Sequence, residues 1–366
     1  MTTSTLDEVR TRARRGIWFL LWRVGIVQAL SLATGVFLAR WLGPEPFGTL
    51  AVAQALSAVF ALVGDLGLGA ALVQKSDAVE ELERHAVFTV QMLLVVALGA
   101  LVLAAGPAVA ALVWHTELSR SLLAPIVLAT AIAPYRSLAV VGLERDLRFA
   151  RIAAIETAEH AAYCAFALGL AHEGWGVAAL AGAILARNVV GLLGASALAA
   201  WRPRFTTAIG RVKPLLAFGL AQQTSNIVYV VAGLTAPVVV GRYVGERSLG
   251  LVLWALGNAE RPKPILDVIA RVAFPSYARL GATPEALRTG LERTLHGGLL
   301  ATVLYGGLLA GTAPVLIPLL YTAMWSEAIP YLYVFIALAP VVTATILIDV
   351  TFLARGDSRV VRNLHL

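Results

Sequence analysis

A charged side chain in the middle of a long apolar run is the first feature of this sequence that could do chemistry. Arg187 lies about eleven residues from either end of the apolar stretch 175–200. A charge at the centre of a bilayer costs about 2.5–3.5 kcal/mol on insertion scales, so it tends to face a cavity or a partner. A guanidinium binds phosphate through two parallel hydrogen bonds and keeps its charge in a low-dielectric site. We therefore predict that Arg187 contacts an anionic ligand in a cavity, with structural ion pairing as the alternative.

A second cationic group interrupts the apolar stretch 247–270. The segment 260–264 reads Glu-Arg-Pro-Lys-Pro. Its prolines remove backbone donors and are expected to break the helix. Irregular backbone at membrane depth is tolerated only where it lines a cavity or is buried in protein. Two interpretations follow: a kink held by internal ion pairs, or a cationic patch in which Arg261 and Lys263 bind a phosphate-bearing ligand.

Two further arginines lie nearer to the expected membrane surface. Arg23 and Arg136 each lie about six residues, or roughly 9 Å, from the end of an apolar stretch. Their long side chains could reach the headgroups without a partner. Both arginines are predicted cavity residues, with snorkelling as the alternative.

Polar residues also recur at helical spacing in the stretch 215–240. They are Gln222, Ser225, Asn226, Tyr229 and Gly233. The spacing i, i+3, i+4, i+7 and i+11 puts them on one face of a helix. This face either lines a cavity or forms hydrogen bonds between helices, which polar groups also do in lipid. Both possibilities are open.

No residue pattern favours catalysis or metal binding. Glu156, Glu159 and His160 share a helical face and could bind a metal or relay protons, but Arg148 and Arg151 nearby favour interfacial ion pairs. A single cysteine excludes an internal disulfide and a cysteine-based metal cage. We predict no catalytic residues, no metal and no cofactor.

Composition indicates that the elements positioning these residues are membrane helices. Of 366 residues, 59% are hydrophobic and 14% are charged, and the mean hydropathy is +0.79. Soluble domains are about a quarter charged. A spanning helix needs roughly 20 mostly apolar residues, and about ten such stretches are present. They lie near 17–39, 48–73, 86–113, 121–143, 152–171, 175–200, 215–240, 247–270, 295–320 and 328–354. The predicted fold is therefore an all-α integral membrane protein, with the first stretch an uncleaved helix.

The net charge of +7 is distributed as expected for a membrane protein rather than for a nucleic-acid-binding one. With a cytoplasmic N-terminus, about 20 lysines and arginines of the loops lie on the cytoplasmic side and about four lie opposite. The sequence thus predicts a multi-pass protein with its N-terminus in the cytoplasm and no nucleic-acid partner.

The chain also repeats itself. Arg40-Trp41-Leu42-Gly43, followed by Phe47-Gly48, recurs 202 residues later as Arg242-Tyr243-Val244-Gly245, followed by Leu249-Gly250. Parallel six-helix repeats would give twelve helices and a second half ending near residue 402, so the second lobe is expected to be incomplete. The predicted parts are a cytoplasmic segment 1–16, an N-lobe 17–200, a cytoplasmic linker 201–214 and a C-lobe 215–366.

Several motifs resemble one transporter family when they are taken in order. They are Leu42-Gly43 with Phe47-Gly48, Asp65-Leu66-Gly67-Leu68-Gly69 through Gln74, Leu143-Glu144-Arg145 through Phe149, Gly174-Trp175-Gly176-Val177, Trp201-Arg202-Pro203, Phe274-Pro275 with Ala278-Arg279-Leu280, and Trp325 with Ala328. In order and spacing the chain resembles the polysaccharide transporters, including the Wzx-type lipopolysaccharide flippases, of the multidrug/oligosaccharidyl-lipid/polysaccharide flippase superfamily.

The resemblance implies a fold, a cargo and a location. It implies a two-lobed, MATE-like helical bundle around a central cavity. Such a protein would move a lipid-linked oligosaccharide or polysaccharide of the polyprenyl-diphosphate type across the bacterial inner membrane by alternating access. Membrane lipids and glycan polymerase or assembly proteins would be its partners. One alternative is an antiporter for drugs or organic cations, which an acidic cavity would favour. Another is a membrane enzyme of glycan assembly, a polymerase or ligase, which usually needs a large outer loop.

Overall fold

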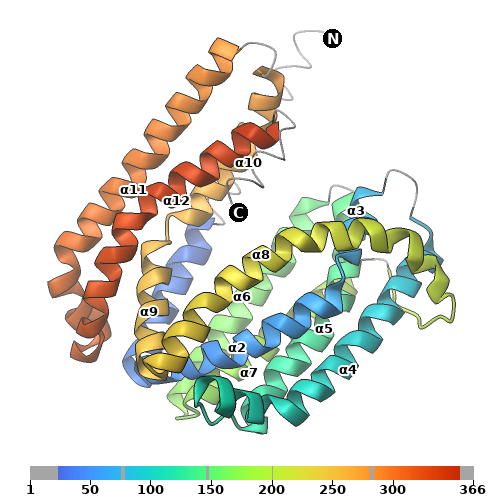
Figure 1. Ribbon diagram of the computed structural model, residues 1–366, viewed down its shortest axis with the longest axis horizontal. Helices are drawn as coiled ribbons and strands as arrows, with labels where there is room; N and C mark the ends of the chain where they lie inside the picture. Colours follow the sequence, from blue (N-terminus) through green and yellow to red (C-terminus); the bar gives the residue numbers. More distant parts are fainter. Residues whose placement is uncertain (1–23, 76–78, 146–147, 200, 281–283, 355–366) are drawn as a thin grey trace. The chain divides into compact units, whose positions relative to one another are not determined.

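The computed structural model describes residues 24–75, 79–145, 148–199, 201–280 and 284–354, and all of its regular elements within these ranges are helical (Figure 1). The predicted all-α membrane fold is thus confirmed. The first described helix, Val24–Leu42, is unlabelled in the figure. The others are α2 (Pro44–Asp65), α3 (Leu68–Gln74), α4 (Glu81–Trp114), α5 (Arg120–Arg145), α6 (Phe149–His172), α7 (Val177–Leu198), η1 (Ile209–Val212), α8 (Lys213–Tyr243), α9 (Glu246–Ala259), α10 (Lys263–Leu280), α11 (Pro284–Tyr321), η2 (Ala323–Ala328) and α12 (Ile329–Ala354).

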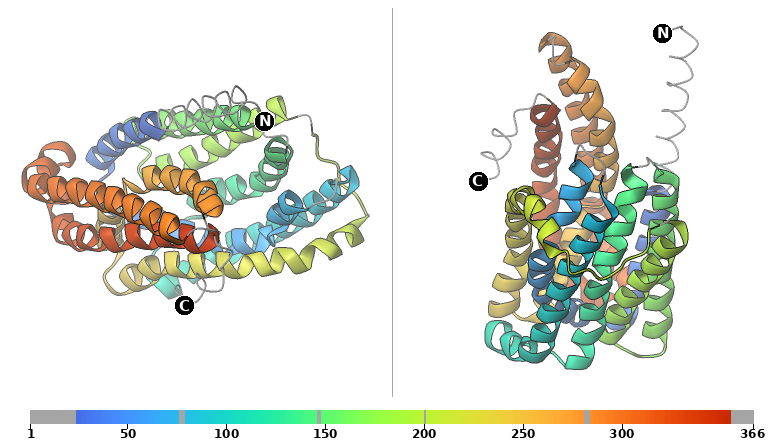
Figure 2. Two further views of the ribbon diagram at one scale, coloured as in Figure 1. Left: turned by 90° about the horizontal axis from the view of Figure 1, so that it is seen from above. Right: turned by 90° about the vertical axis from the view of Figure 1, so that its right-hand side faces the viewer.

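The helices form two compact units. The larger unit comprises residues 33–251, and the smaller one combines the residues up to 32 with those from 252 onward. In the larger unit α8 lies along α2, where Gln223 Nε2 donates to the Leu62 carbonyl at 2.8 Å. In the smaller unit α11 and α12 run side by side (Figure 2). The lobe boundaries predicted from the repeat stay a prediction.

Seven of the described helices are long and apolar enough to cross a membrane. They are Val24–Leu42, Pro44–Asp65, Glu81–Trp114, Arg120–Glu144, Val177–Leu198, Leu287–Tyr321 and Ala323–Phe352. The predicted count of about ten stays a prediction. Three of the expected stretches are not among these seven: those near 152–171, 215–240 and 247–270, which correspond to α6, to α8 and to the broken pair α9 and α10.

The expected single stretch 48–73 is interrupted in the structure. Helix α2 ends at Asp65 because the next two residues adopt the left-handed conformation, with φ 49° at Leu66 and φ 65° at Gly67. This conformation suits glycine, and a Cβ at Gly67 would also fall 2.9 Å from the carbonyl carbon of Gly219 on α8. Close packing of α3 against α8 therefore depends on this turn.

The break predicted at the two prolines is confirmed. Helix α9 ends at Ala259 and α10 begins at Lys263, with a turn between them. The Lys263 amide donates to the Glu260 carbonyl at 2.9 Å, and the Leu266 amide donates to the Pro262 carbonyl at 3.1 Å. The chain therefore makes one tight turn and resumes as a helix.

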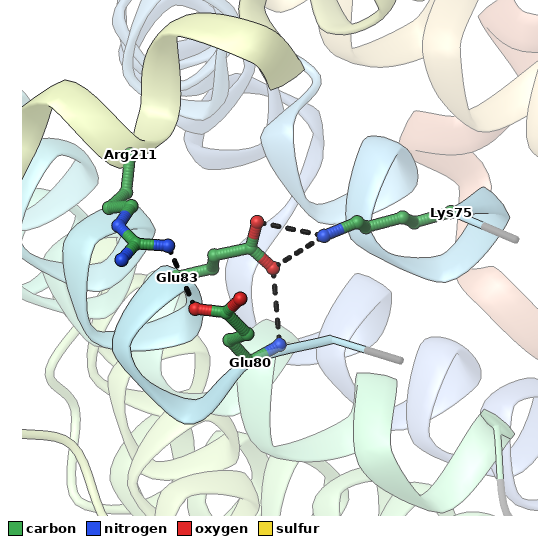
Figure 3. Close-up of polar contacts among 4 residues, drawn as sticks. All are labelled: Lys75, Glu80, Glu83 and Arg211. Atoms are coloured by element: carbon green, nitrogen blue, oxygen red, sulfur yellow. Dashed lines mark hydrogen bonds and ion pairs between the residues drawn. The ribbon is translucent and has the colours of Figure 1, made fainter. Parts of the chain in front are cut away.

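Helix α4 separates the two sets of loops that the charge count assigns to opposite sides of the membrane. Its 34 residues extend about 51 Å, more than the hydrocarbon core of about 30 Å. At its N-terminus Glu80 and Glu83 form a capping box, Lys75 Nζ pairs with Glu83 at 2.7 Å, and Arg211 pairs with Glu80 at 2.8 Å (Figure 3). Four charged groups thus fix the linker and the α2–α3 segment to this end of α4.

The opposite end of α4 is held by α8. The indole of Trp114 donates to the Pro237 carbonyl at 2.8 Å, and Arg242 donates to the Leu112 and Val113 carbonyls at 2.9 and 2.7 Å. Arg211 and Arg242, which the charge count assigns to different sides, therefore bind different ends of one long helix.

Two close backbone contacts join the repeated segments. A Cβ at Gly48 would fall 2.6 Å from the carbonyl carbon of Glu246, and a Cβ at Gly250 would fall 2.8 Å from that of Pro44. The offset of 202 residues converts one contact into the other. Reciprocal contacts of this kind are typical of an interface with two-fold symmetry. The repeat stays a prediction, and a local pseudo-two-fold axis between its halves would produce this pair of contacts.

Candidate functional site

The turn between α9 and α10 fixes one of the predicted arginines in place. Arg261 Nε donates to Asn258 Oδ1 at 3.0 Å, and its guanidinium also interacts with the hydroxyl of Tyr321. The Tyr305 hydroxyl donates to the Asn258 carbonyl at 2.8 Å, and Gln28 Nε2 donates to the Arg261 carbonyl at 3.1 Å. The side chain and the backbone of Arg261 are thus both anchored.

Aromatic packing holds the tyrosine that supports this arginine. The rings of Trp254 and Tyr321 meet edge to face, with centroids 4.8 Å apart and an interplanar angle of 82°. Trp254 also packs on Trp325 at 5.2 Å, and Trp325 is fully buried. Such aromatic pairs add stability beyond the area they bury. Tyr321 therefore has little freedom to move, and Arg261 is held in one orientation.

The charge of Arg261 is not neutralised by the groups that hold it. Within the described ranges its guanidinium bonds only to neutral groups, the amide of Asn258 and the phenol of Tyr321. The adjacent Lys263 faces Glu260 at 3.8 Å, and both of these side chains are exposed. The N-terminus of α10 adds the positive end of its helix dipole. The turn is therefore a positively charged region that can bind an anion.

An apolar cavity lies beside the same turn. It has a volume of about 220 Å³. Its walls come from α9, α10, α11 and α12, and include Leu256, Leu266, Phe335, Leu338, Val342 and Ile346. Glu260 and Lys263 line it as well, and Thr302 and Thr343 hydrogen-bond to each other at 2.9 Å. A hydrocarbon chain in this cavity would lie next to the cationic turn.

Arg187 lies in the larger unit, at the eleventh position of the 22-residue helix α7. Its side chain is exposed, and its positive charge influences Tyr163 on α6. No acidic partner of Arg187 is found in the part of the chain that the structure describes. About 15 Å of helix separates it from either end of α7, so in a membrane-spanning α7 its guanidinium would lie near the middle of the bilayer. It remains a candidate anion-binding group.

Arg136 is engaged differently, in an ion pair across α5 and α6. Its guanidinium donates two hydrogen bonds to Glu159, one of them 2.9 Å long. The Glu159 side chain is 4% exposed and that of Arg136 is 29% exposed. Gly191 of α7 packs against this pair and leaves no room for a Cβ. The pair neutralises both charges, which favours a structural role for Arg136.

Removing this arginine is expected to destabilise the protein. Arg136→Ala strands a buried carboxylate, and breaking a buried pair from one side costs about 3–5 kcal/mol. Arg136→Ala/Glu159→Gln should recover part of that loss, because no buried charge then remains. Unfolding in mixed detergent measures both variants. Equal stability of the parent and Arg136→Ala would refute the structural role.

The remaining predicted residues cannot be placed as side chains. Arg23 lies outside the described residues. Gln222, Ser225, Asn226 and Tyr229 lie on helix α8, but their side chains are also outside the described part. Among the residues that the structure describes, no cluster of histidine, cysteine, aspartate and glutamate could hold a metal ion. The sequence could have indicated the contact between Arg261 and Asn258, because the two residues are three positions apart, a spacing that brings side chains together on a helix. It carried no sign of the contact between Arg261 and Tyr321.

Comparison with known families identifies the chain. Residues 37–330 match the model of a family described as polysaccharide biosynthesis protein. The chain belongs to this family. Curated proteins to which the chain is similar include the succinoglycan biosynthesis transport protein ExoT of Rhizobium meliloti (strain 1021), 29% identical over 336 residues. The lipopolysaccharide biosynthesis protein WzxC of Escherichia coli (strain K12) is 26% identical over 316 residues. These alignments cover 89% and 84% of this chain, but only 65% and 63% of the relatives.

Solved structures with little sequence similarity share the fold. The lipid II flippase MurJ in an inward closed conformation has a TM-score of 0.76 at 13% identity, covering 95% of this chain and 78% of MurJ. An inward-facing multidrug resistance transporter of the MATE family has a TM-score of 0.72 at 16% identity, covering 94% and 87%. The predicted MATE-like helical fold is thereby confirmed.

Proposed function

We propose that this protein moves a lipid-linked oligosaccharide or polysaccharide across the bacterial inner membrane by alternating access. The observation that carries the proposal is Arg261, a positioned arginine whose contacts within the described ranges are all neutral, in a helix break beside an apolar cavity. A polyprenyl diphosphate glycan needs such a combination, because its phosphates are anionic and its lipid is hydrocarbon. The names of the similar proteins ExoT and WzxC support a glycan as cargo.

The charge of the site argues against the two alternatives. An exporter of organic cations needs carboxylates where the cargo binds, whereas Arg261 and Arg187 carry positive charge without acidic partners in the described parts. A glycan polymerase or ligase needs acid–base groups outside the membrane, and the described connections between helices are short. Membrane lipids and glycan assembly proteins are the proposed partners.

Loss of the gene should test this function in cells. Deletion is expected to abolish the surface polysaccharide and to trap its lipid-linked precursor on the cytoplasmic leaflet. Expression of the parental protein should restore export, and a fractionated lipid extract measures both pools. Normal surface polysaccharide in the deletion strain, without a second flippase gene, would contradict the proposal.

The proposed orientation places the N-terminus and the loop 202–213 in the cytoplasm and the loops 114–120 and 321–327 in the periplasm. Single cysteines introduced into these loops, in a Cys164→Ala background, are to be labelled with an impermeant maleimide. Only the cysteines in the two periplasmic loops should react in intact spheroplasts. Labelling of the 202–213 loop from outside would reverse the orientation.

A further inference from the structure

A cavity of about 260 Å³ in the larger unit is lined by oxygen-bearing side chains that the proposed transport site does not use. It lies among α2, α4 and α5. Its polar lining residues are Asp65, Gln91, Thr130 and Ser137. Asp65 is exposed and Gln91 is 1% exposed, so the cavity connects a surface carboxylate with a buried amide.

The buried amide presents an oxygen without a partner. Gln91 Nε2 donates to the Asp65 carbonyl at 2.8 Å and to Asp65 Oδ1 at 3.0 Å. Both of these atoms are acceptors, so the orientation of the amide is fixed, with its nitrogen toward Asp65. Gln91 Oε1 has no hydrogen-bond partner. A buried carbonyl oxygen in this condition is costly unless a ligand satisfies it.

A proline in α5 frees a second oxygen, the backbone carbonyl of Thr130. Pro134 has no amide hydrogen, so it cannot make the helical hydrogen bond to the carbonyl of Thr130, four residues earlier. Thr130 and Pro134 both line the cavity. The Thr130 hydroxyl donates to the Ile126 carbonyl at 3.0 Å, which leaves its own lone pairs available. Carbonyls freed by broken helices coordinate small cations in transporters.

The charge of the cavity selects the class of ligand. Asp65 is the ionisable residue among those that line it, and its carboxylate accepts hydrogen bonds from the amides of Gly67 and Gln91. One carboxylate with neutral oxygens suits a monovalent hard cation, whereas Ca²⁺ sites gather more acidic oxygens. The volume exceeds that of a bare ion, so water would complete its coordination.

We propose that this cavity binds one partly hydrated sodium ion, held by the Asp65 carboxylate, Gln91 Oε1 and the oxygens of Thr130. Ser137 borders the same space and offers a further hydroxyl. The exposed carboxylate is the entrance, and the buried amide is the inner end. Binding here joins α2, α4 and α5, so it is expected to stabilise the larger unit.

The test is thermal unfolding of the purified intact protein in NaCl against choline chloride at equal ionic strength. The parent should show a saturable rise in Tm with sodium, because a ligand that binds the folded state raises its stability. Asp65→Asn keeps the shape but removes the charge, and should weaken the apparent sodium affinity by about tenfold or more. Asp267→Asn, the same change at an exposed carboxylate of α10, should leave the affinity unchanged.

A variant at the proline distinguishes loss of sodium binding from loss of folding. Pro134→Ala restores the amide that bonds to the Thr130 carbonyl, so it should make α5 more regular while weakening sodium binding. Absence of a sodium-dependent Tm rise in the parent, or an equal rise in the parent, Asp65→Asn and Pro134→Ala, would overturn the proposal. Neither result bears on glycan export, because the measurement contains no glycan.

Discussion

Arg261→Ala is expected to abolish glycan export without unfolding the protein. The substitution removes a charge whose described contacts are all neutral, so no buried carboxylate is left unpaired. Losing two charge-assisted hydrogen bonds to a phosphate, at about 1.5–3 kcal/mol each, should lower export by about 100-fold or more. Arg261→Lys keeps the charge but loses the planar fork, so it should export at an intermediate rate. Complementation of the deletion strain measures glycan export by the parent, Arg261→Ala and Arg261→Lys.

Arg288→Ala is the matched control for this prediction. Arg288 is 81% exposed on α11 of the same unit and pairs with Glu292 at 2.7 Å, so its loss should leave export unchanged. Arg187→Ala is expected to lower export as Arg261→Ala does, because Arg187 also carries its charge within an apolar helix and has no acidic partner in the described ranges. Parental export by a normally expressed Arg261→Ala protein would eliminate this residue as a cargo anchor.

Gly48→Ala is expected to destabilise the protein by about 3 kcal/mol or more, because the added methyl group meets backbone that cannot rotate away. The obstacle is the carbonyl of Glu246. The pseudo-two-fold arrangement predicts a similar loss for Gly250→Ala, which meets the carbonyl of Pro44. Unfolding in mixed detergent compares the two variants with the parent.

Gly35→Ala is a control that is expected to raise stability rather than lower it. Gly35 lies within the helix Val24–Leu42 and has open space around it, so alanine should stabilise that helix by up to about 1 kcal/mol. If Gly48→Ala and Gly250→Ala behave like Gly35→Ala, the close contact between the repeats does not exist. Unequal losses of stability at Gly48 and Gly250 would argue against the pseudo-two-fold symmetry, but not against the close contact itself.

Features set by local chemistry were predictable from the sequence. Pro262 and Pro264 broke the helix where expected, since a missing amide acts within one turn. Arg211 and Arg242, which the charge count assigns to different sides, bind different ends of α4, while the orientation in the membrane stays a prediction. The repeat itself stays a prediction, although its offset of 202 residues relates the two glycine contacts to each other.

Features set by packing were not predictable. Snorkelling was a sufficient explanation for Arg136, but the close approach of α7 at Gly191 brings α5 and α6 together and gives Arg136 a buried partner in Glu159. The left-handed turn at Leu66 and Gly67 also lies inside an apolar run that reads as one helix. The aromatic support of Arg261 joins residues 60 or more positions apart, for which a single sequence carries no signal.

Translocation by the purified protein tests the central claim most directly. Proteoliposomes are prepared with the intact protein and a fluorescent oligosaccharide on a polyprenyl diphosphate, and an impermeant glycosidase is added outside. The account predicts that vesicles with the parental protein expose the inner pool of glycan over time and saturably. Protein-free vesicles and vesicles with Arg261→Ala should protect about half of the glycan, the share in the inner leaflet of a symmetric bilayer. The account would be contradicted if vesicles with the folded parental protein protect that same pool of glycan. If these vesicles also take up an organic cation along an ion gradient, the antiporter is favoured.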